Sequence, residues 1–272
     1  RQHSHKDICF WSPFPLATRE ENQRESMNIK EHVSLKEYTT FKIGGPARYF
    51  VIAQSIEEVM EALNFARERS LPLFILGGGS NILVADDGFD GLVLAVRIPG
   101  IISKEQGDHV LVSAGAGVVW DELVLWTIER RFAGFECLSG VPGTVGGAVF
   151  MNSNFPKKGV YVGDCLFKAK LLTKEGNIKD VDNAYFHFAY DKSILQETGE
   201  ILLWAIFKLE KIDKDVLWKR GMEALNYRNE TQPKGLSAGC TFRNTSIVDA
   251  MRIPTPDRIT SAGYLVDKAG LK

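Results

Sequence analysis

The chain has 272 residues, and its 33 lysines and arginines against 34 aspartates and glutamates give a formal net charge of −1. That length fits one to three compact units, and a balanced charge provides no overall positive field for nucleic acid or an anionic membrane. The four cysteines are widely spaced without a C-x-x-C pair, so we expect no metal site and a reducing, cytoplasmic compartment. No window is apolar enough to span a membrane, so we expect no membrane attachment. We also expect no nucleic-acid partner and a monomer.

The N-terminal part of the chain predicts a β-α-β unit after an irregular start. Residues 1–26 show no sustained hydrophobic period, and we expect them to form an extension outside the fold. The β-branched and aromatic run Ala47–Ala53 predicts a strand, and Ser55, with Glu58 three positions later, has the capping-box spacing of a helix start. The apolar run Leu71–Leu76 predicts a second strand, and a glycine cluster follows it directly.

The rest of the chain continues with strand and helix patterns. Amphipathic or apolar spacing predicts helices at Val118–Arg131 and Asp213–Asn229 and strands at Gly91–Val96, His109–Ala114, Cys165–Thr173, Ile178–Val181 and Ile201–Leu209. The short turn between residues 173 and 178 makes a hairpin of its two flanking strands. We interpret the whole as an α+β protein with an extension at 1–26, a first lobe at 27–96, a second lobe at 97–209 and a partial domain at 210–272.

The segment LGGGSNILVADDGFDG (Leu76–Gly91) is the first candidate binding loop. Consecutive glycines let the main chain approach a ligand closely and direct N–H groups at phosphate oxygens. It is not a P-loop, because Gly79-Ser80-Asn81 stands where Gly-Lys-Ser/Thr is required. It also does not fit G-x-G-x-x-G, because no predicted helix starts right after it. Taken alone, the segment is equally compatible with an ordinary turn.

Two more glycine-rich segments adjoin predicted strands. LSGVPGTVGGAVFMNS (Leu138–Ser153) combines dense glycines with Pro142, which favours a fixed backbone over a floppy linker. TFKIGGPARYF (Thr40–Phe50) places two glycines before a strand. Either segment alone is also typical of a corner in a β-rich domain, but three such loops in one chain favour a shared binding role.

Several motifs together resemble one enzyme family. TTFKIGGPA, LGGGSNILVADDGFDG, SGVPGTVGGAV, FAYDKSI, RNETQP and AGCTFRN occur in the order found in UDP-N-acetylenolpyruvoylglucosamine reductases, and the match extends from Val33 to Lys272. The glycine segments are shared with the wider FAD-linked fold, whereas A-G-x-x-F-[KR]-N indicates the reductases. The resemblance implies a two-lobed FAD-binding domain of the vanillyl-alcohol-oxidase type plus a partial α+β substrate-binding domain.

The resemblance also implies cofactors and a reaction. FAD would lie across the first two lobes without a covalent bond, since no His or Cys lies between Gly77 and Gly91. NADPH would reduce it, and UDP-N-acetylglucosamine enolpyruvate would then be reduced to UDP-N-acetylmuramate, a step of peptidoglycan precursor synthesis. The expected cofactor-binding residues are Thr40, Ile43, Gly44, Gly45, Gly77, Gly78, Gly79, Ser80, Asn81, Gly140, Pro142, Gly143, Thr144, Gly146, Gly147 and Asn152.

Cys240 occupies the position of the family's proton donor, a serine in A-G-S-x-F-[KR]-N. A thiol releases a proton more readily than a serine hydroxyl, so the role is chemically open to it. The alternative is a structural cysteine, because free cysteines are commonly buried as small hydrophobes. The resemblance further implies substrate contacts from Tyr190, Arg228, Arg243 and Asn244.

The family motif F-x-Y-R-x-S is altered here. Residues 188–193 are FAYDKS, so Asp191 stands where the family's arginine stabilises the developing enolate. A carboxylate opposes negative charge, and losing a preorganised cation costs transition-state stabilisation. Lys192 is the catalytic candidate that supplies the cation after a small backbone shift. The alternative is that Asp191 and Lys192 are only a solvated pair.

The family's catalytic glutamate lies in a segment that follows the last motif matched here. We therefore expect either a C-terminally truncated member of the shorter class of these reductases or a chain that runs the reaction slowly. Two further interpretations stay open, namely another FAD-linked oxidase of the same fold and a catalytically impaired flavin-binding remnant.

Overall fold

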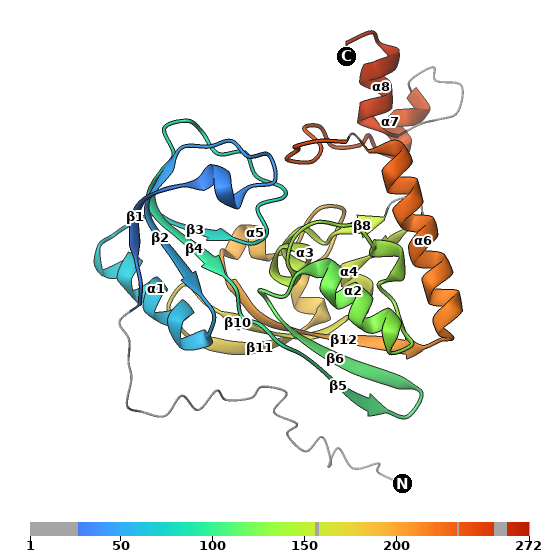
Figure 1. Ribbon diagram of the computed structural model, residues 1–272, viewed down its shortest axis with the longest axis horizontal. Helices are drawn as coiled ribbons and strands as arrows, with labels where there is room; N and C mark the ends of the chain where they lie inside the picture. The colour runs from blue at the N-terminus through green and yellow to red at the C-terminus, as the bar shows by residue number, and fades with distance from the viewer. Residues whose placement is uncertain (1–26, 156–157, 233, 253–259, 272) are drawn as a thin grey trace.

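The computed structural model describes residues 27–155, 158–232, 234–252 and 260–271 (Figure 1). The expected extension at residues 1–26 lies outside this part of the chain. Two β-sheets with helices packed beside them are followed by a long helix and two shorter ones (Figure 1). None of the helices formed by the described residues is long and apolar enough to cross a lipid bilayer.

The first sheet has the strand order β1-β2-β4-β3. Its strands are β1 (Lys30–Ser34), β2 (Pro46–Ala53), β3 (Leu73–Leu76) and β4 (Phe89–Val96). Both β2 and β3 run parallel to β4, while β1 is antiparallel to β2. The helix α1 (Ile56–Glu68) connects β2 to β3, which confirms the predicted β-α-β order.

The start of α1 follows from its sequence. The Ser55 hydroxyl accepts a hydrogen bond from the N–H of Glu58 at 3.2 Å, as an N-cap residue should. The Glu58 carboxylate in turn accepts from the N–H of Gln54 at 2.6 Å, one residue earlier than in a standard capping box. The face of α1 that packs into the core consists of Val59, Ala62, Leu63 and Ala66.

The second sheet has the order β11-β10-β12-β6-β5, with antiparallel neighbours throughout. Its strands are β5 (Ile101–Gln106), β6 (His109–Gly115), β10 (Leu166–Leu172), β11 (Ile178–Asp182) and β12 (Ile201–Lys211), and β7 (Phe132–Ala133) pairs with the end of β12. The helix α2 (Trp120–Glu129) begins with the fully buried Trp120. Its ring centroid lies 5.0 Å from that of Phe135 and 6.4 Å from that of Phe207 on β12, so α2 is anchored in the core beside this sheet.

Short elements fill the connections between these strands. They are η1 (Leu35–Tyr38), η2 (Glu136–Leu138), α3 (Val145–Met151), β8 (Asn154–Phe155), β9 (Val160–Tyr161), α4 (Val162–Cys165), η4 (Asn183–Phe186) and α5 (Leu195–Thr198). After β12 come α6 (Lys214–Thr231), α7 (Ile247–Arg252) and α8 (Ala262–Lys268). The segment between α6 and α7 returns toward the first sheet (Figure 1), and Gly239 in the A-G-C-T-F-R-N motif lies close to Asn81, which follows β3.

Several parts of the fold were not predicted from the sequence, and α3 and β5 are two of them. The predicted loop Leu138–Ala148 contains the start of a helix, because α3 begins at Val145 with Thr144 as its N-cap. Two glycines in the first turn lower the helix propensity and conceal it. Strand β5 was not predicted, because its last four residues are all exposed and lack the alternation of a half-buried strand.

Candidate active site

A cavity of about 740 Å³ brings together segments that are far apart in the sequence. Its lining includes Gly77–Asn81, Val141–Thr144, Gly146, Gly147, Tyr190, Asp191, Arg228 and Cys240–Asn244. The first two glycine segments and the A-G-C-T-F-R-N motif, which the sequence picked out separately, therefore meet at one site.

The two glycine segments pack directly against each other. A Cβ atom added at Gly78 would lie 2.5 Å from the Cα of Gly143, closer than any real side chain approaches. Gly79 has a φ of +68°, and a Cβ there would lie 1.9 Å from the carbonyl oxygen of Tyr38. Glycine is therefore required at positions 78 and 79 by contacts within the protein itself.

The main-chain N–H groups of Gly77–Asn81 are available to a ligand. Within the described part of the chain, none of them donates to another main-chain group, and the same is true of Gly143 and Thr144. By contrast, the N–H of Gly146 donates to the carbonyl of Ala116 at 2.9 Å, and that of Gly147 donates to the Thr144 hydroxyl at 3.4 Å. A main-chain N–H group that is removed from water without an acceptor costs free energy. The N–H groups of residues 77–81 therefore need an acceptor such as a diphosphate, whereas those of Gly146 and Gly147 at the start of α3 already have one.

Arg228 on α6 offers a guanidinium group to the same cavity. Its Nε and Nη2 atoms are buried and have no hydrogen-bond partner among the described residues, and its Cζ lies 5.4 Å from the ring centroid of Phe155. Burial lowers the pKa of this guanidinium, while the charge of Asp121 acts in the opposite direction. A buried cation with unused donors fits an anionic ligand.

Hydrogen bonds join the segment that carries Cys240 to other parts of the chain. The Thr40 hydroxyl donates to the carbonyl of Ser237 at 2.7 Å, which connects the segment to the loop before β2. The Asn244 amide donates to the Tyr190 hydroxyl at 3.1 Å, which connects it to the turn after η4. Cys240 therefore lies where three regions of the sequence converge on the cavity.

Cys240 also differs from the other described cysteines in its exposure. Cys137 and Cys165 are partly buried, whereas Cys240 is exposed. Burial raises the pKa of Cys165 to about 12, and burial likewise raises the pKa of Cys137. Because Cys240 is exposed and lines the cavity, it is the thiol best placed for chemistry among these three.

Tyr190 and Asp191 form a tight turn at the cavity wall. Ala189 and Lys192 are paired across the turn at 3.1 Å, and Asp191 has a left-handed φ of 52°. The Asp191 carboxylate accepts a hydrogen bond from the Asn154 amide at 3.0 Å. Burial raises the pKa of Tyr190, and the charges of Asp191 and Cys240 add to this shift. A fixed carboxylate thus lines the cavity at the position where the family carries an arginine.

Lys192 is not brought to the cavity. Its ammonium group forms an ion pair with Glu197 at 2.7 Å, and the residue is absent from the described lining. Within the turn, Asp191 lines the cavity, whereas the ammonium group of Lys192 is directed to Glu197 on α5. In this conformation Lys192 does not replace the missing arginine.

Several residues expected at the cofactor support the site from outside the cavity lining. The Gly140 N–H donates to the Asp121 carboxylate at 2.8 Å, and the Asn152 amide donates to the Ala189 carbonyl at 3.0 Å. A Cβ at Gly45 would lie 2.0 Å from the carbonyl oxygen of Asp86. The expected residues outside this lining are Thr40, Ile43, Gly44, Gly45, Gly140 and Asn152.

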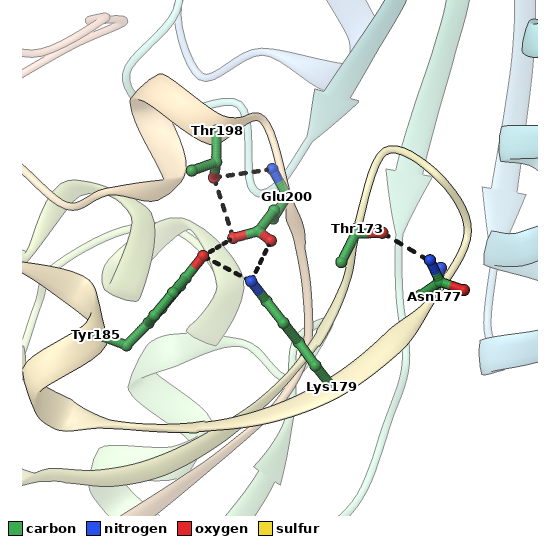
Figure 2. Close-up of polar contacts among 6 residues, drawn as sticks. All are labelled: Thr173, Asn177, Lys179, Tyr185, Thr198 and Glu200. Atoms are coloured by element: carbon green, nitrogen blue, oxygen red, sulfur yellow. Dashed lines mark hydrogen bonds and ion pairs between the residues drawn. The ribbon is translucent and has the colours of Figure 1, made fainter.

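The cavity also contains residues that the sequence did not indicate. Gly199, Glu200, Ile201 and Leu202 line it at the start of β12, and the Glu200 carboxylate is bound by Lys179 and Tyr185 (Figure 2). No motif marks these residues, because their position depends on how β12 meets the rest of the sheet.

Similarity to known proteins adds the chemical context. Residues 47–182 match the family model described as FAD binding domain. UDP-N-acetylenolpyruvoylglucosamine reductase of Bacillus velezensis is 34% identical over 256 residues, which are 93% of this chain and 79% of that protein. The enzyme of the same name from Protochlamydia amoebophila is 37% identical over 240 residues, covering 88% of this chain and 74% of the relative.

Solved structures agree with these sequence matches. UDP-N-acetylenolpyruvylglucosamine reductase from Thermus caldophilus superposes with a TM-score of 0.73 at 31% identity, covering 91% of this chain and 82% of that one. 6-Hydroxy-D-nicotine oxidase from Arthrobacter nicotinovorans has a TM-score of 0.52 at 18% identity over 68% of this chain and 42% of its own, which indicates a shared fold alone.

Proposed function

Because the chain belongs to the UDP-N-acetylenolpyruvoylglucosamine reductase family, we propose that it uses NADPH and bound FAD to reduce the enolpyruvyl group of a UDP-sugar for peptidoglycan synthesis. The observation that carries this proposal is one cavity that contains both the unpaired N–H groups of Gly77–Asn81 and the exposed thiol of Cys240. The first group suits a dinucleotide, and the second suits a proton transfer.

The residues that would hold FAD are those with unused donors. The N–H groups of Gly77–Asn81, with those of Gly143 and Thr144, would bind the diphosphate. Bound FAD supplies the hydride chemistry that no protein side chain performs. Thr40, Ile43, Gly44, Gly45, Gly140 and Asn152 would act indirectly, by fixing the loops that surround the cofactor.

Cys240 would hold the proton needed in the second half of the reaction. Hydride addition to one carbon of the enol ether leaves an enolate, and the adjacent carbon must then be protonated. The Cys240 Sγ would donate this proton, with its segment held in place by the Thr40–Ser237 and Asn244–Tyr190 hydrogen bonds. This arrangement gives Asn244 and Tyr190 a positioning role as well as a substrate contact.

The charges around the cavity suit an anionic substrate incompletely. Arg228 and Arg243 line it, and their guanidinium groups would bind the diphosphate or carboxylate of a UDP-sugar. Asp191 lines it too and would oppose the negative charge of an enolate. Lys192 is paired with Glu197 and does not offset the charge of Asp191 in the cavity. The charges near Asp191 therefore favour a second candidate function, a flavin-binding protein whose sugar reduction is slow.

A two-step spectroscopic experiment tests the proposal. The purified chain is reconstituted with FAD, NADPH is added without oxygen, and the enolpyruvyl UDP-sugar follows. Loss of the visible flavin absorbance after NADPH and its recovery after the sugar support the reductase. Loss without recovery supports the slow flavin protein, and no FAD binding refutes both. Repeating the first step with NADH determines the nucleotide preference.

A further inference from the structure

Lys179, Tyr185 and Glu200 form a cluster of three polar side chains (Figure 2), and of the three only Glu200 is among the described residues that line the cavity. The Lys179 ammonium on β11 is 2.5 Å from Oε1 of Glu200 and donates to the Tyr185 hydroxyl at 2.6 Å. The Tyr185 hydroxyl donates to Oε2 of Glu200 at 2.7 Å. These contacts connect β11, η4 and the residue that precedes β12.

The Glu200 carboxylate is held on both oxygens and withdrawn from solvent. Its side chain is 7% exposed, against 33% for Lys179, and the Thr198 hydroxyl also approaches Oε2 at 3.2 Å. Burial acts to raise the pKa of Glu200, but hydrogen bonds from Lys179 and Tyr185 outweigh it, so the pKa is lowered. A carboxylate with both oxygens engaged in this way is suited to hold its main chain in place.

The main chain that Glu200 holds is part of the cavity wall. Gly199, Glu200, Ile201 and Leu202 all line the cavity. On the sheet side, Ile201 is paired with Leu172 of β10, and two residues later the Leu203 carbonyl accepts from the N–H of Ala116 at 2.9 Å. The cluster therefore fixes the point at which β12 enters the site.

The parts of a bound FAD can be assigned by elimination. Its two halves extend in opposite directions from the diphosphate, which the loop at Gly77–Asn81 would hold. If the reacting ring lies near Cys240, as the proposed function requires, the adenosine half would extend away from this residue. The apolar lining residues Val96, Ala116, Ile201 and Leu202 provide a surface suited to a flat base.

We propose that Lys179, Tyr185 and Glu200 form a positioning device for the adenosine half of FAD. The inference rests on the proposed function, since it requires that the cavity binds FAD. The contacts of Lys179 and Tyr185 with the Glu200 carboxylate would keep the main chain of Gly199–Leu202 in the conformation against which the adenosine half packs.

Flavin titrations of three variants test this inference. Glu200→Gln, Lys179→Met and the milder Tyr185→Phe each remove part of the cluster. We expect the dissociation constant for FAD to rise about tenfold, as when other supporting residues of a site are removed, while that for FMN stays within about twofold. At saturation with FAD, the visible absorbance spectrum should match that of the parent chain, because the ring environment is unchanged.

A neighbouring ion pair on the same hairpin provides the matched control. Lys170 and Asp180 join β10 to β11 at 2.7 Å, and neither residue lines the cavity. Asp180→Asn should leave both dissociation constants unchanged. The inference is overturned if the cluster variants weaken FMN as much as FAD, alter the flavin spectrum, or bind FAD as the parent does. A parent chain that binds no FAD would instead refute the proposed function.

Discussion

The glycine junction and the Tyr190–Asn244 contact line the same cavity but are held in different ways. At the junction, a Cβ on Gly78 would lie 2.5 Å from the Cα of Gly143, so the main chains leave no room for a side chain. At the other contact, a single side-chain hydrogen bond of 3.1 Å joins Tyr190 to Asn244, and Tyr190 is 36% exposed. Close packing of two main chains fixes the first region, the glycine junction. Polar side chains, which a substitution can change, hold the second region, around Tyr190 and Asn244.

The two substitutions that the sequence resemblance leads us to expect, Cys240 for serine and Asp191 for arginine, both lie in the second region, where side chains rather than packed main chains form the cavity wall. At the glycine junction, any added side chain would displace the main chain. We therefore expect changes at the junction to affect folding, and changes near Tyr190 to affect the reaction.

Gly78→Val should have the largest effect and tests the steric part of this comparison. The branched side chain would collide with the main chain at Gly143, and we expect the free energy of unfolding to fall by about 3 kcal/mol or more, with loss of FAD binding. Chemical denaturation of the flavin-free protein measures the first effect, and flavin absorbance measures the second. An unchanged unfolding curve would show that the junction opens readily.

Cys240→Ala should have the next largest effect, on one half-reaction alone. Reoxidation of the reduced flavin by the enolpyruvyl sugar should slow about 100-fold or more, the size typical of a lost general acid. Reduction by NADPH should be unaffected, because it needs no proton from this thiol. Stopped-flow absorbance separates the two steps, and Cys240→Ser is the matched control that keeps a proton donor. Equal slowing of both steps would remove Cys240 from this role.

Gly147→Ala distinguishes space reserved for a ligand from space filled by protein. A Cβ at Gly147 would meet only the Thr144 hydroxyl, at 3.8 Å, and the residue lines the cavity. The flavin-free protein should keep its stability or gain up to about 1 kcal/mol, since alanine favours the helix. Affinity for FAD should fall about tenfold. Unchanged affinity, measured by fluorescence titration, would place the cofactor elsewhere.

The contrast between Gly78 and Gly147 also shows what the sequence could and could not predict. The hydrophobic periods predicted α1, β2, β4, β6, β12 and α6, because local spacing determines these elements. The glycine segments predicted a binding site. Some of these glycines are needed because another part of the protein packs against them, and others leave room for a ligand. For Gly78 the packing partner is Gly143, 65 residues later in the chain. No local sequence pattern carries that information.

The same limit applies to the charged residues near Tyr190. The sequence placed Lys192 beside Asp191 and left two alternatives, a replacement cation or a solvated pair. The ion pair joins Lys192, in the turn before α5, to Glu197 on α5, and the cluster of Lys179, Tyr185 and Glu200 joins β11, η4 and the residue before β12. Such pairings follow from the fold rather than from spacing, so they emerged only from the structure.

Asp191→Asn tests whether the carboxylate itself limits the reaction. The replacement keeps an oxygen that can accept from the Asn154 amide and removes the negative charge from the cavity wall. Relief of about 1 kcal/mol of repulsion corresponds to reoxidation by the sugar about fivefold faster, again with no change in reduction by NADPH. A slower second step in the Asn variant would mean that the carboxylate takes part in the reaction.

Lys192→Met should have the smallest effect, because the ammonium group is engaged by Glu197 at 2.7 Å and its side chain is 47% exposed. An exposed ion pair contributes at most about 1 kcal/mol to stability, so the unfolding curve should hardly move, and both half-reactions should stay within about twofold of the parent. Glu197→Gln is the matched control, since it releases the ammonium group while keeping it in the chain.

If Lys192→Met slows reoxidation by the sugar tenfold or more while Glu197→Gln accelerates it, the lysine leaves its ion pair during the reaction and supplies the cation that Asp191 displaced. The polar region would then adjust to its substrate, in a way that the glycine junction cannot.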